Sequence, residues 1–362
     1  MKILLLGDIN SSHLLKWIRS LSLAGFEIAV FTLNEPNQLI LDSLSNIKVF
    51  SSVENSKNNF NGSDLGKLKY LTAVSSLRRI VKSWAPDIVH AHYATSYGLL
   101  GALSGHKTLF ISVWGSDIFE FPTKSSIHKK SISLILNQAT KIFSASEILA
   151  DKTRLLTKKD VFVIPFGIDT DFFDEKINSD ADEIIIGTVK SLETIYGIDI
   201  LLTAFAKLQK LRPLLLLRLQ IVGGGSQENN LKQLASDLNI NSSVEFIGKI
   251  PFDYLPEYYK RFNIFANLSR SESFGVSVLE AMSTELPVVV TSTGGLNEIV
   301  SSECGIHVSV ENVDETVNAF LELVDNRFLR SKMGKAGRTR VKQLYDWNSC
   351  VDKMSYFYKQ YK

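Results

Sequence analysis

Cysteine is almost absent from this sequence, which holds only Cys304 and Cys350 among its 362 residues. Two cysteines cannot build the disulfide framework of a small secreted scaffold, and they favour a reducing compartment. Long apolar runs are missing as well, because stretches such as Leu214 to Leu217 fall far short of the roughly 20 residues that a membrane helix needs. The apolar start at Ile3 to Leu6 is too short for a signal-peptide core, so we expect a cytoplasmic protein.

Net charge is also small, at +2, but the sum conceals an asymmetry. Residues 1–165 carry 19 Lys and Arg against 12 Asp and Glu, whereas residues 166–362 carry 21 against 26. Such an asymmetry suggests that the first half faces an anionic partner. The alternative is a solvated surface over which the charged residues are unevenly distributed. Nucleic acid is not expected, because the chain shows no motif that reads it, and an anionic membrane surface or a pyrophosphate-linked lipid acceptor fits better. The basic residues of the first half gather at Lys67, Lys69, Arg78, Arg79, Lys82, Lys124, Lys129, Lys130, Lys141, Lys152, Arg154, Lys158 and Lys159.

What is present has the composition of an ordinary globular protein, with 45% hydrophobic and 22% charged residues. Short runs suited to strands alternate with longer amphipathic stretches, which is typical of parallel sheets with helical crossovers. The predicted strands are Lys2–Leu6, Glu27–Thr32, Ile47–Phe50, Ile88–His90, Thr108–Val113, Lys141–Ser144, Val161–Ile164, Glu183–Thr188, Leu217–Val222, Val244–Ile247, Ile264–Asn267, Val288–Thr291 and Ile306–Val308. The predicted helices include Leu14–Ala24, Leu68–Trp84, Ile198–Lys210, Gln227–Leu238, Phe274–Ser283 and Val313–Val324.

Two successive series of strand–helix units predict an α/β protein with two doubly wound, Rossmann-like domains, at residues 1–166 and 167–346. The final stretch, residues 347–362, is aromatic-rich and helical in pattern, so it is expected to pack on another part of the chain. The polar segment Asp169–Asp182 is the best candidate for a linker. The stretch Ser51–Ser63, rich in Asn, Ser and Lys, is expected to be a mobile loop.

One predicted strand–loop–helix junction carries an informative set of side chains, in the run SRSESFGVSVLEAM at residues 269–282. Open α/β sheets bind ligands at the carboxyl ends of their strands. A helix that begins near residue 274 leaves its first amides without acceptors, so they can hold a phosphate. Glu280, in the second turn, can accept both hydroxyls of a ribose, and Glu272 can accept hydroxyls of a second ring beyond the phosphates. The phosphate-binding amides are those of Phe274, Gly275 and Val276.

The surroundings of these two glutamates resemble a known family. Seven residues separate Glu272 from Glu280, and the chain continues with PVVVT at residues 287–291, with Gly294-Gly295 and with Glu298. This resembles the E-x7-E glycosyltransferases of the GT-B fold, specifically glycosyltransferase family 4 (glycosyl transferases group 1). The bare spacing is common on solvated helices, but SESFGVSVLEAM followed by PVVVTSTGG makes it specific. The resemblance covers nearly the whole chain and implies two Rossmann-like domains that face a central cleft, with a C-terminal helix that crosses back to the N-terminal domain.

Further donor-binding residues follow from the same resemblance. Gly224 lies in IVGGG, which is similar to the family's glycine loop, and Gly248 and Ile250 follow a strand against which relatives lay the nucleotide base. The alternative for Gly248 is that it only allows the chain to make a tight turn. Gly294 and Gly295 can offer amides to the donor, and a plain turn is the alternative for Gly294.

The resemblance also implies cations that neutralise the donor's diphosphate, because the family's pattern uses no bound metal. Relatives place an Arg or Lys after the first strand of the second domain and a Lys before a glycine. Lys190 matches the first, but Ile195 and Tyr196 stand where the second is expected. One lost charge-assisted contact costs roughly 1.5–3 kcal/mol unless another base substitutes. Arg270 is a further candidate for holding the diphosphate.

In the first domain, the turn Gly7–His13 lacks the G-x-G-x-x-G of dinucleotide-binding proteins, and it also lacks the glycine pair that family 4 members often carry. Asn10 and His13 are candidates for contacts to the acceptor or the sugar. Capping of the following helix is the alternative for His13.

Two further loops of this domain are expected to face the cleft. The segment Trp114–Asp117 resembles the family's H-G-x-D loop, with Trp114 in place of a histidine that contacts the donor sugar in relatives. An indole can stack on a sugar or donate one N–H, but it cannot shuttle protons. His92 is a candidate for that catalytic role, with a structural histidine as the alternative, and Asp117 either orients the loop or contacts the acceptor. Phe166 stands where a similar hinge in the family has Asn.

By resemblance, the reaction moves a hexosyl or N-acetylhexosaminyl group from a UDP- or GDP-sugar to a hydroxyl of a glycan or lipid-linked acceptor, with retention of configuration. Glu272, Lys190 and His92 are the predicted catalytic residues. No cofactor and no metal are expected, since the nucleotide-sugar is a substrate. A role in cell-envelope polysaccharide or glycoconjugate synthesis, peripheral to the inner face of the membrane, is the expected context.

Three alternatives to this interpretation stay open. One is a GT-B sugar-nucleotide epimerase, which normally needs more acid and base side chains. Another is a non-catalytic glycosyltransferase-like subunit, which Trp114 and the missing lysine favour and the intact Glu272/Glu280 pair disfavours. An oxidoreductase is disfavoured by the Gly7–His13 turn.

Overall fold

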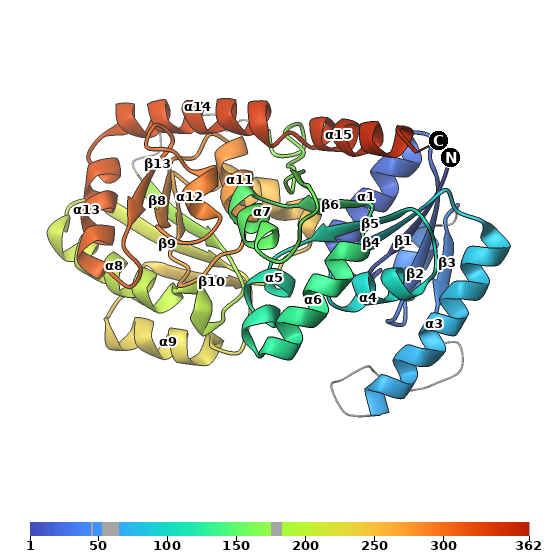
Figure 1. Ribbon diagram of the computed structural model, residues 1–362. Coiled ribbons are helices and arrows are strands. Elements are labelled where there is room, and N and C mark those ends of the chain that lie inside the picture. Colours follow the sequence, from blue (N-terminus) through green and yellow to red (C-terminus); the bar gives the residue numbers. More distant parts are fainter. Residues whose placement is uncertain (45, 53–64, 175–182, 362) are drawn as a thin grey trace. The chain divides into compact units, whose positions relative to one another are not determined.

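The computed structural model describes residues 1–44, 46–52, 65–174 and 183–361, and for residues 65–71 it describes the backbone alone. The chain divides into two compact units, each with its own parallel sheet (Figure 1). Unit 1 comprises residues 1–166 and 349–362, and unit 2 comprises residues 167–348.

Unit 1 contains a seven-stranded sheet in the order β3-β2-β1-β4-β5-β6-β7, and all of its neighbouring strands are parallel. Strands β1 and β5 read as nearly unbroken apolar runs because helices cover both faces of such a sheet. The strands are β1 (Lys2–Leu6), β2 (Glu27–Thr32), β3 (Lys48–Ser51), β4 (Ile88–His92), β5 (Leu109–Val113), β6 (Lys141–Ser144) and β7 (Val161–Val163).

The helices of unit 1 begin where the sequence offers caps. The Ser125 and Ser146 hydroxyls accept the amides of His128 at 3.4 Å and Leu149 at 3.2 Å, which places the starts of α6 and α7. The helices are α1 (Ser12–Leu23), α2 (Gln38–Ser43), α3 (Leu65–Trp84), α4 (Ser96–Leu103), α5 (Ser116–Phe119), the 3-10 turn η1 (Phe121–Thr123), α6 (Ser126–Gln138) and α7 (Glu147–Arg154).

Unit 2 contains a six-stranded parallel sheet in the order β10-β9-β8-β11-β12-β13. Its strands are β8 (Glu183–Val189), β9 (Leu216–Val222), β10 (Val244–Gly248), β11 (Ile264–Asn267), β12 (Val288–Thr291) and β13 (Gly305–Val308). Its helices are α8 (Ile198–Leu211), α9 (Glu228–Asp237), α10 (Leu255–Arg261), α11 (Val276–Ser283), α12 (Leu296–Ile299), α13 (Val313–Val324) and α14 (Arg327–Leu344), with 3-10 turns η2 (Thr194–Tyr196) and η3 (Phe252–Tyr254).

Helix α14 is the longest element that the sequence pattern did not indicate. It is polar and contains Gly334 and Gly337, which weaken a helix prediction. Gly334 is needed because a Cβ there would lie 2.0 Å from the carbonyl oxygen of Glu285. Asn326 could have indicated the start of this helix, because its side chain caps the helix by accepting the amide of Leu329 at 2.9 Å.

The terminal helix α15 (Trp347–Lys359) begins within the last residues of unit 2, and its remainder belongs to unit 1. There Tyr358 is fully buried, and its ring stacks on Phe110 with centroids 5.8 Å apart. Of the aromatic residues in the terminal sequence, Tyr358 is therefore part of the core of unit 1, whereas Tyr356 is 63% exposed.

The predicted fold class is confirmed, since both units are parallel, doubly wound α/β folds, and the strand bounds agree with the prediction within two residues. Two expectations need correction. The helix expected to begin near Phe274 begins at Val276, and the start of the expected linker is packed into unit 2, where Phe173 is buried. Residues 53–63 of the expected mobile loop and residues 175–182 of the expected linker lie outside the described residues.

Candidate active site

Unit 2 reverses its strand order at β8, and two of the predicted catalytic residues lie at this point. The chain runs outward from β8 to β9 and β10, then returns to the other side of β8 as β11. Doubly wound folds bind ligands at the carboxyl ends of strands where the order reverses. Lys190 directly follows β8, and the loop of residues 268–275 follows β11. The structure therefore brings Lys190 and Glu272 to the same edge of the sheet.

Lys190 and Glu272 form an ion pair at this edge. Their side chains are only 15% and 10% exposed, so solvent screens this pair less than it screens a surface pair. The same Glu272 oxygen lies 3.4 Å from both the Asn267 amide nitrogen and the Ser269 hydroxyl, which donate to it. Asn267 and Ser269 were not identified from the sequence, although their position at the end of a predicted strand is the signal that could have found them.

Tyr196 occupies the place where the resemblance leads one to expect a second lysine. The Lys190 ammonium lies 4.5 Å from the centroid of the Tyr196 ring, which is within the range of a cation–π contact. Burial, followed by the charges of Glu272 and Glu193, raises the pKa of the Tyr196 hydroxyl. An aromatic face can orient the one lysine, but it supplies no second positive charge.

Glycines bring the Glu272 loop against the start of α12. The Gly295 amide donates to the Glu272 carbonyl oxygen at 3.0 Å, and a Cβ on Gly294 would lie 1.8 Å from that oxygen. A Cβ on Gly295 would lie 2.6 Å from Cα of Phe274. These glycines therefore position the loop, and the Gly295 amide, which was expected to be available to the donor, already donates to Glu272.

Gly294→Ala is expected to destabilise unit 2 by more than about 2 kcal/mol, because Gly294 combines a φ of +47° with this contact. Gly248→Ala is the matched control, since Gly248 has a φ of +82° but no atom within 4 Å of its Cβ position. We expect Gly248→Ala to cost only about 1 kcal/mol. Urea unfolding of both variants measures the difference in their free energies of unfolding. Equal losses of stability would show that the contact with Glu272 does not contribute.

The glycine loop after β9 packs against Lys190 in the same way. A Cβ on Gly223 would lie 1.9 Å from the Lys190 carbonyl oxygen, and the Gly223 amide donates to the Gly248 carbonyl at 2.9 Å. The carbonyl of Gly224 accepts the amide of Leu192 at 3.3 Å. Gly224 and Ile250, predicted to contact the donor, thus lie in the loops after β9 and β10, and Gly248 is the last residue of β10. Their contacts with the donor stay predictions.

The start of α11 differs from the expected geometry. Gly275, with a φ of +106°, is the residue that precedes the helix, so Val276 is its first residue. A Cβ on Gly275 would lie 2.7 Å from Leu296, which shows why this position needs glycine. Phe274 is buried and lies before the helix. The eight-residue helix still directs its amino end toward the loop that carries Glu272, and phosphate binding by these amides stays a prediction.

Glu280 is only 6% exposed and is held by a buried tyrosine. The Tyr259 hydroxyl donates to Glu280 at 2.7 Å, and burial, followed by the charge of Glu280, raises the pKa of Tyr259 well above its ordinary value. No pattern in the sequence had indicated a role for this tyrosine on α10. The ribose contact predicted for Glu280 therefore requires a carboxylate that keeps Tyr259 as one partner.

Arg270 already has two carboxylate partners within unit 2. It binds Asp199 through two donors at 3.0 and 2.8 Å and Glu311 at 2.6 Å. These hydrogen bonds, from Asp199 first and Glu311 next, raise the pKa of its guanidinium. The diphosphate contact predicted for Arg270 stays a prediction, with Asp199 and Glu311 competing for the same cation.

In unit 1, three of the rings suggested by the sequence form one partly exposed aromatic cluster. His13 stacks on Phe166 with centroids 4.5 Å apart, and the Trp114 ring lies 6.0 Å from His13 and 5.6 Å from Phe166. His13 is the second residue of α1, and Ser11 is the residue that precedes this helix, so the capping alternative for His13 is wrong. Burial, then the charge of Lys16, lowers the pKa of His13. Sugar or acceptor contacts of His13 and Trp114 stay predictions that suit such ring faces.

His92 lies in strand β4 and not in the loop where it was expected. The ring is 1% exposed, and neither nitrogen has a hydrogen-bond partner among the described residues. Burial lowers the pKa of His92 to about 3, so the ring is neutral near pH 7. This position favours the structural alternative over a proton shuttle. Its neighbour His90, 4.3 Å away between centroids, is bonded to Tyr358 and Ser112 at 2.5 and 2.8 Å.

The other two predicted contacts of unit 1 hold loops together. The fully buried Asp117 carboxylate accepts the amides of Gly115 and Ala94, both at 2.8 Å, and of Trp114 at 3.1 Å. The side-chain amide of Asn10 donates to the Glu35 carbonyl at 3.1 Å, and its oxygen accepts a backbone amide from the same loop. Both side chains are therefore engaged, and their contacts to the acceptor or the sugar stay predictions.

Comparison with known proteins adds a family. Residues 169–340 match the model described as glycosyl transferases group 1, and residues 2–146 match the model described as glycosyl transferase 4-like. An uncharacterized glycosyltransferase of Methanocaldococcus jannaschii is 26% identical over 279 residues, which cover 76% of this chain and 75% of that protein. Other curated relatives match over 38% to 78% of their own length.

Solved structures agree in fold. Sucrose-phosphate synthase from Thermosynechococcus elongatus superposes with a TM-score of 0.83 at 20% identity, covering 99% of this chain and 98% of that one. Anabaena HepE, solved in complex with UDP-glucose, superposes with a TM-score of 0.79 at 18% identity. The superposition covers 99% of this chain and 100% of that one. None of the helices in the described part of the chain is long and apolar enough to cross a membrane. Two family models that together span nearly the whole chain, and a fold shared with solved glycosyltransferases, show that the chain belongs to the group 1 glycosyltransferases.

Proposed function

We propose that the protein transfers a sugar from a nucleoside diphosphate sugar to a hydroxyl of a glycan or lipid-linked acceptor, with retention of configuration and without a metal ion. The observation that carries the proposal is the Lys190–Glu272 pair at the point of strand reversal in unit 2. A cation and a carboxylate that neutralise one another in the free chain can separate onto a diphosphate and a sugar hydroxyl. The solved relative with UDP-glucose supports this class of donor.

The remaining donor contacts follow the order of groups along such a molecule. The amides at the start of α11 would hold the phosphate, with Lys190 beside them. Glu280, oriented by Tyr259, would accept the ribose hydroxyls. Gly224 and Ile250, in the loops after β9 and β10, and Gly248, at the end of β10, would face the base. UDP and GDP are the candidate nucleotides, and both hexosyl and N-acetylhexosaminyl groups are candidates for the sugar.

In the proposed reaction, the bond between the anomeric carbon and the diphosphate oxygen breaks, and the acceptor oxygen bonds to the same face of that carbon. The acceptor proton passes to the departing phosphate oxygen. Lys190 and the helix amides stabilise the charge that develops there, and Glu272 holds the sugar in position. The work of these residues is electrostatic stabilisation and orientation, so no further protein base is required.

The test uses the purified chain with UDP-, GDP- and ADP-sugars in the absence of acceptor, where water acts as the acceptor. Proton NMR of the first product distinguishes the anomers, and retention predicts that an α-linked donor gives the α-sugar first. The β-sugar would overturn the retaining assignment. Isomerised nucleotide-sugar would indicate an epimerase, and binding without turnover in the presence of candidate acceptors would indicate a non-catalytic subunit. Unchanged rates in EDTA are expected, and loss of activity there would contradict metal independence.

Lys190→Gln is expected to weaken binding of the free nucleoside diphosphate about tenfold to a hundredfold, because a charge-assisted contact contributes roughly 1.5–3 kcal/mol. Lys207→Gln is a matched control, since Lys207 pairs with Asp314 at 2.8 Å on the surface of the same unit. Isothermal titration calorimetry measures both affinities. Equal affinities would remove Lys190 from the diphosphate site.

A further inference from the structure

A hollow on the surface of unit 1 combines apolar walls with a basic rim, and no step of the proposed transfer uses it. It has a volume of about 490 Å³, within the usual range of ligand pockets. Helix α6 contributes one stripe, and the segment that follows α7 forms the other wall. The lining residues are Ser126, Lys129, Lys130, Ser133, Leu134, Leu155 and Leu156.

The apolar side chains here are exposed to an unusual degree. Ile127, Leu134 and Leu155 are 78%, 68% and 76% exposed, whereas Leu156 is 8% exposed and lies at the base. Ile127, Lys130 and Leu134 share one face of α6 because they are three to seven residues apart. The opposite face of α6, including Leu136, is buried in the core. The outward face of α6 therefore exposes apolar side chains that do not pack in the core of unit 1.

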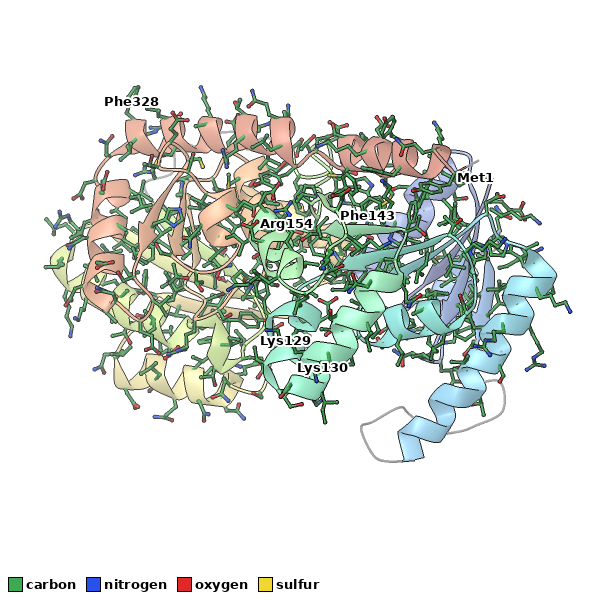
Figure 2. All side chains as sticks on the ribbon, viewed as in Figure 1. Met1, Lys129, Lys130, Phe143, Arg154 and Phe328 are labelled. Carbon is green, nitrogen blue, oxygen red and sulfur yellow. The ribbon has the colours of Figure 1, made fainter. Side chains whose placement is uncertain are left out.

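The two charged residues that line the hollow, Lys129 and Lys130, are both basic. Helix α6 contains no carboxylate, and residues 124–159 contain eight Lys and Arg against two acidic residues. Those two, Glu147 and Asp151, both pair with Arg154, at 3.3 and 2.7 Å. Figure 2 labels Lys129 and Lys130 on α6 and Arg154 on α7, the two helices next to the hollow. The lysines that line the hollow form no ion pair with a carboxylate among the described residues.

We propose that this face of unit 1, formed by α6 and residues 155–159, docks on an anionic lipid bilayer. Ile127, Leu134 and Leu155 enter the boundary between headgroups and acyl chains, and the hollow above Leu156 takes part of one acyl chain. Lys129, Lys130 and the lysines of the second wall contact acidic headgroups. A basic surface with exposed aliphatic side chains is the combination that interfacial segments use, and one that a soluble partner of neutral charge would not require. The proposal does not depend on the donor chemistry.

Sedimentation with vesicles tests the proposal on the full chain. Binding to vesicles of phosphatidylcholine with phosphatidylglycerol is expected, with weak binding to phosphatidylcholine alone and a decrease as salt rises. The double variant Lys129→Gln/Lys130→Gln is expected to reduce affinity for the acidic vesicles roughly tenfold or more. Leu134→Glu/Leu155→Glu is expected to abolish binding. Equal recovery with neutral and acidic vesicles, or no effect of either variant, would overturn the proposal.

Controls come from unit 2, where Leu214 and Phe328 are 97% and 79% exposed. Leu214→Glu/Phe328→Glu is expected to bind vesicles like the original protein. Slow hydrolysis of the nucleotide-sugar is expected to be unchanged in all of these variants, so loss of vesicle binding and failure of the proposed transfer are distinguishable. Light scattering without lipid tests whether a second copy of the chain covers this face instead. A dimer that the Leu134→Glu/Leu155→Glu variant dissociates would assign the face to that second copy and overturn the proposal.

A fluorescent label locates the contact. Cys304 and Cys350 are each 1% exposed, so an environment-sensitive dye reacts selectively with a cysteine introduced by Leu155→Cys. Acidic vesicles are expected to shift its emission to the blue, as an apolar environment does, while the same dye at Leu214→Cys is unchanged. The absence of a shift at position 155 during sedimentation would place the contact elsewhere and overturn the proposal.

Discussion

Glu272→Gln is expected to lower the rate of sugar transfer at least about a hundredfold, which corresponds to about 2.7 kcal/mol of lost transition-state stabilisation. Glutamine keeps the shape of the side chain, but it neither carries the charge that pairs with Lys190 nor accepts two hydroxyls with both of its terminal atoms. The measurement is the steady-state rate of transfer, or of slow hydrolysis, with a saturating nucleotide-sugar.

The same variant is expected to bind the free nucleoside diphosphate as tightly as the original protein or more tightly. In the free chain Lys190 is neutralised by Glu272, so a diphosphate must displace that carboxylate. Removing the carboxylate removes this competition, while loss of the sugar contact lowers turnover. The split between affinity and rate separates this role from simple unfolding, which would lower both.

Asp325→Asn is the matched control for Glu272→Gln. It breaks an ion pair of the same unit, that between Asp325 and Arg212, on a more exposed surface. Its activity is expected to be unchanged, because surface pairs contribute little and this one lies away from the predicted site. Turnover of Glu272→Gln close to that of Asp325→Asn would contradict the assignment of Glu272.

Acid is expected to destabilise unit 1 through its two buried histidines. Burial lowers the pKa of His92 to about 3, and burial followed by the charge of His92 lowers the pKa of His90 well below 6.5. Both rings are neutral in the folded chain, and they gain protons only on unfolding. The stability they confer is fully present above pH 6.5 and falls as the pH drops from 6.5 toward 3. At pH 5 the loss from His92 is about 2 kcal/mol, and His90 adds a loss in the same direction.

Substitution of either histidine distinguishes its contribution. His92→Leu is expected to leave stability at pH 7 nearly unchanged, since neither ring nitrogen has a partner among the described residues, and to flatten the dependence on pH. His90→Leu is expected to cost about 2 kcal/mol or more at pH 7, because the buried hydroxyls of Tyr358 and Ser112 lose their partner. Urea unfolding at pH 7 and pH 5 measures both effects. An unchanged pH slope in His92→Leu would contradict the linkage.

The same variant tests the catalytic role first suggested for His92. A ring that is buried and neutral has no proton to give near pH 7, so His92→Leu is expected to retain activity. Loss of turnover with normal stability would restore the catalytic interpretation. The sequence placed His92 beyond the end of its strand because the run IVH ends the clear apolar pattern, whereas the parallel pairing of β4 with β5 continues through His92.

Sequence and structure contributed different parts of this description. The alternation of strand and helix patterns predicted both sheets, because a parallel strand buried on both faces must be apolar throughout. The glutamates at residues 272 and 280 could be found because their spacing and surroundings are local in the chain. The polar helix α14 was missed, because its glycines are explained only by a contact with Glu285, which lies 49 residues before Gly334.

The sequence by itself determined the fold class, the family and the run that carries Glu272 and Glu280, since each is a pattern along the chain. Only the tertiary structure decided which charges meet: Lys190 pairs with Glu272 across 82 residues, Arg270 is held by Asp199, and His92 is buried. The physical reason is that charge pairing and burial depend on distances in space, which the order of strands around β8 and β1 sets and no local pattern encodes.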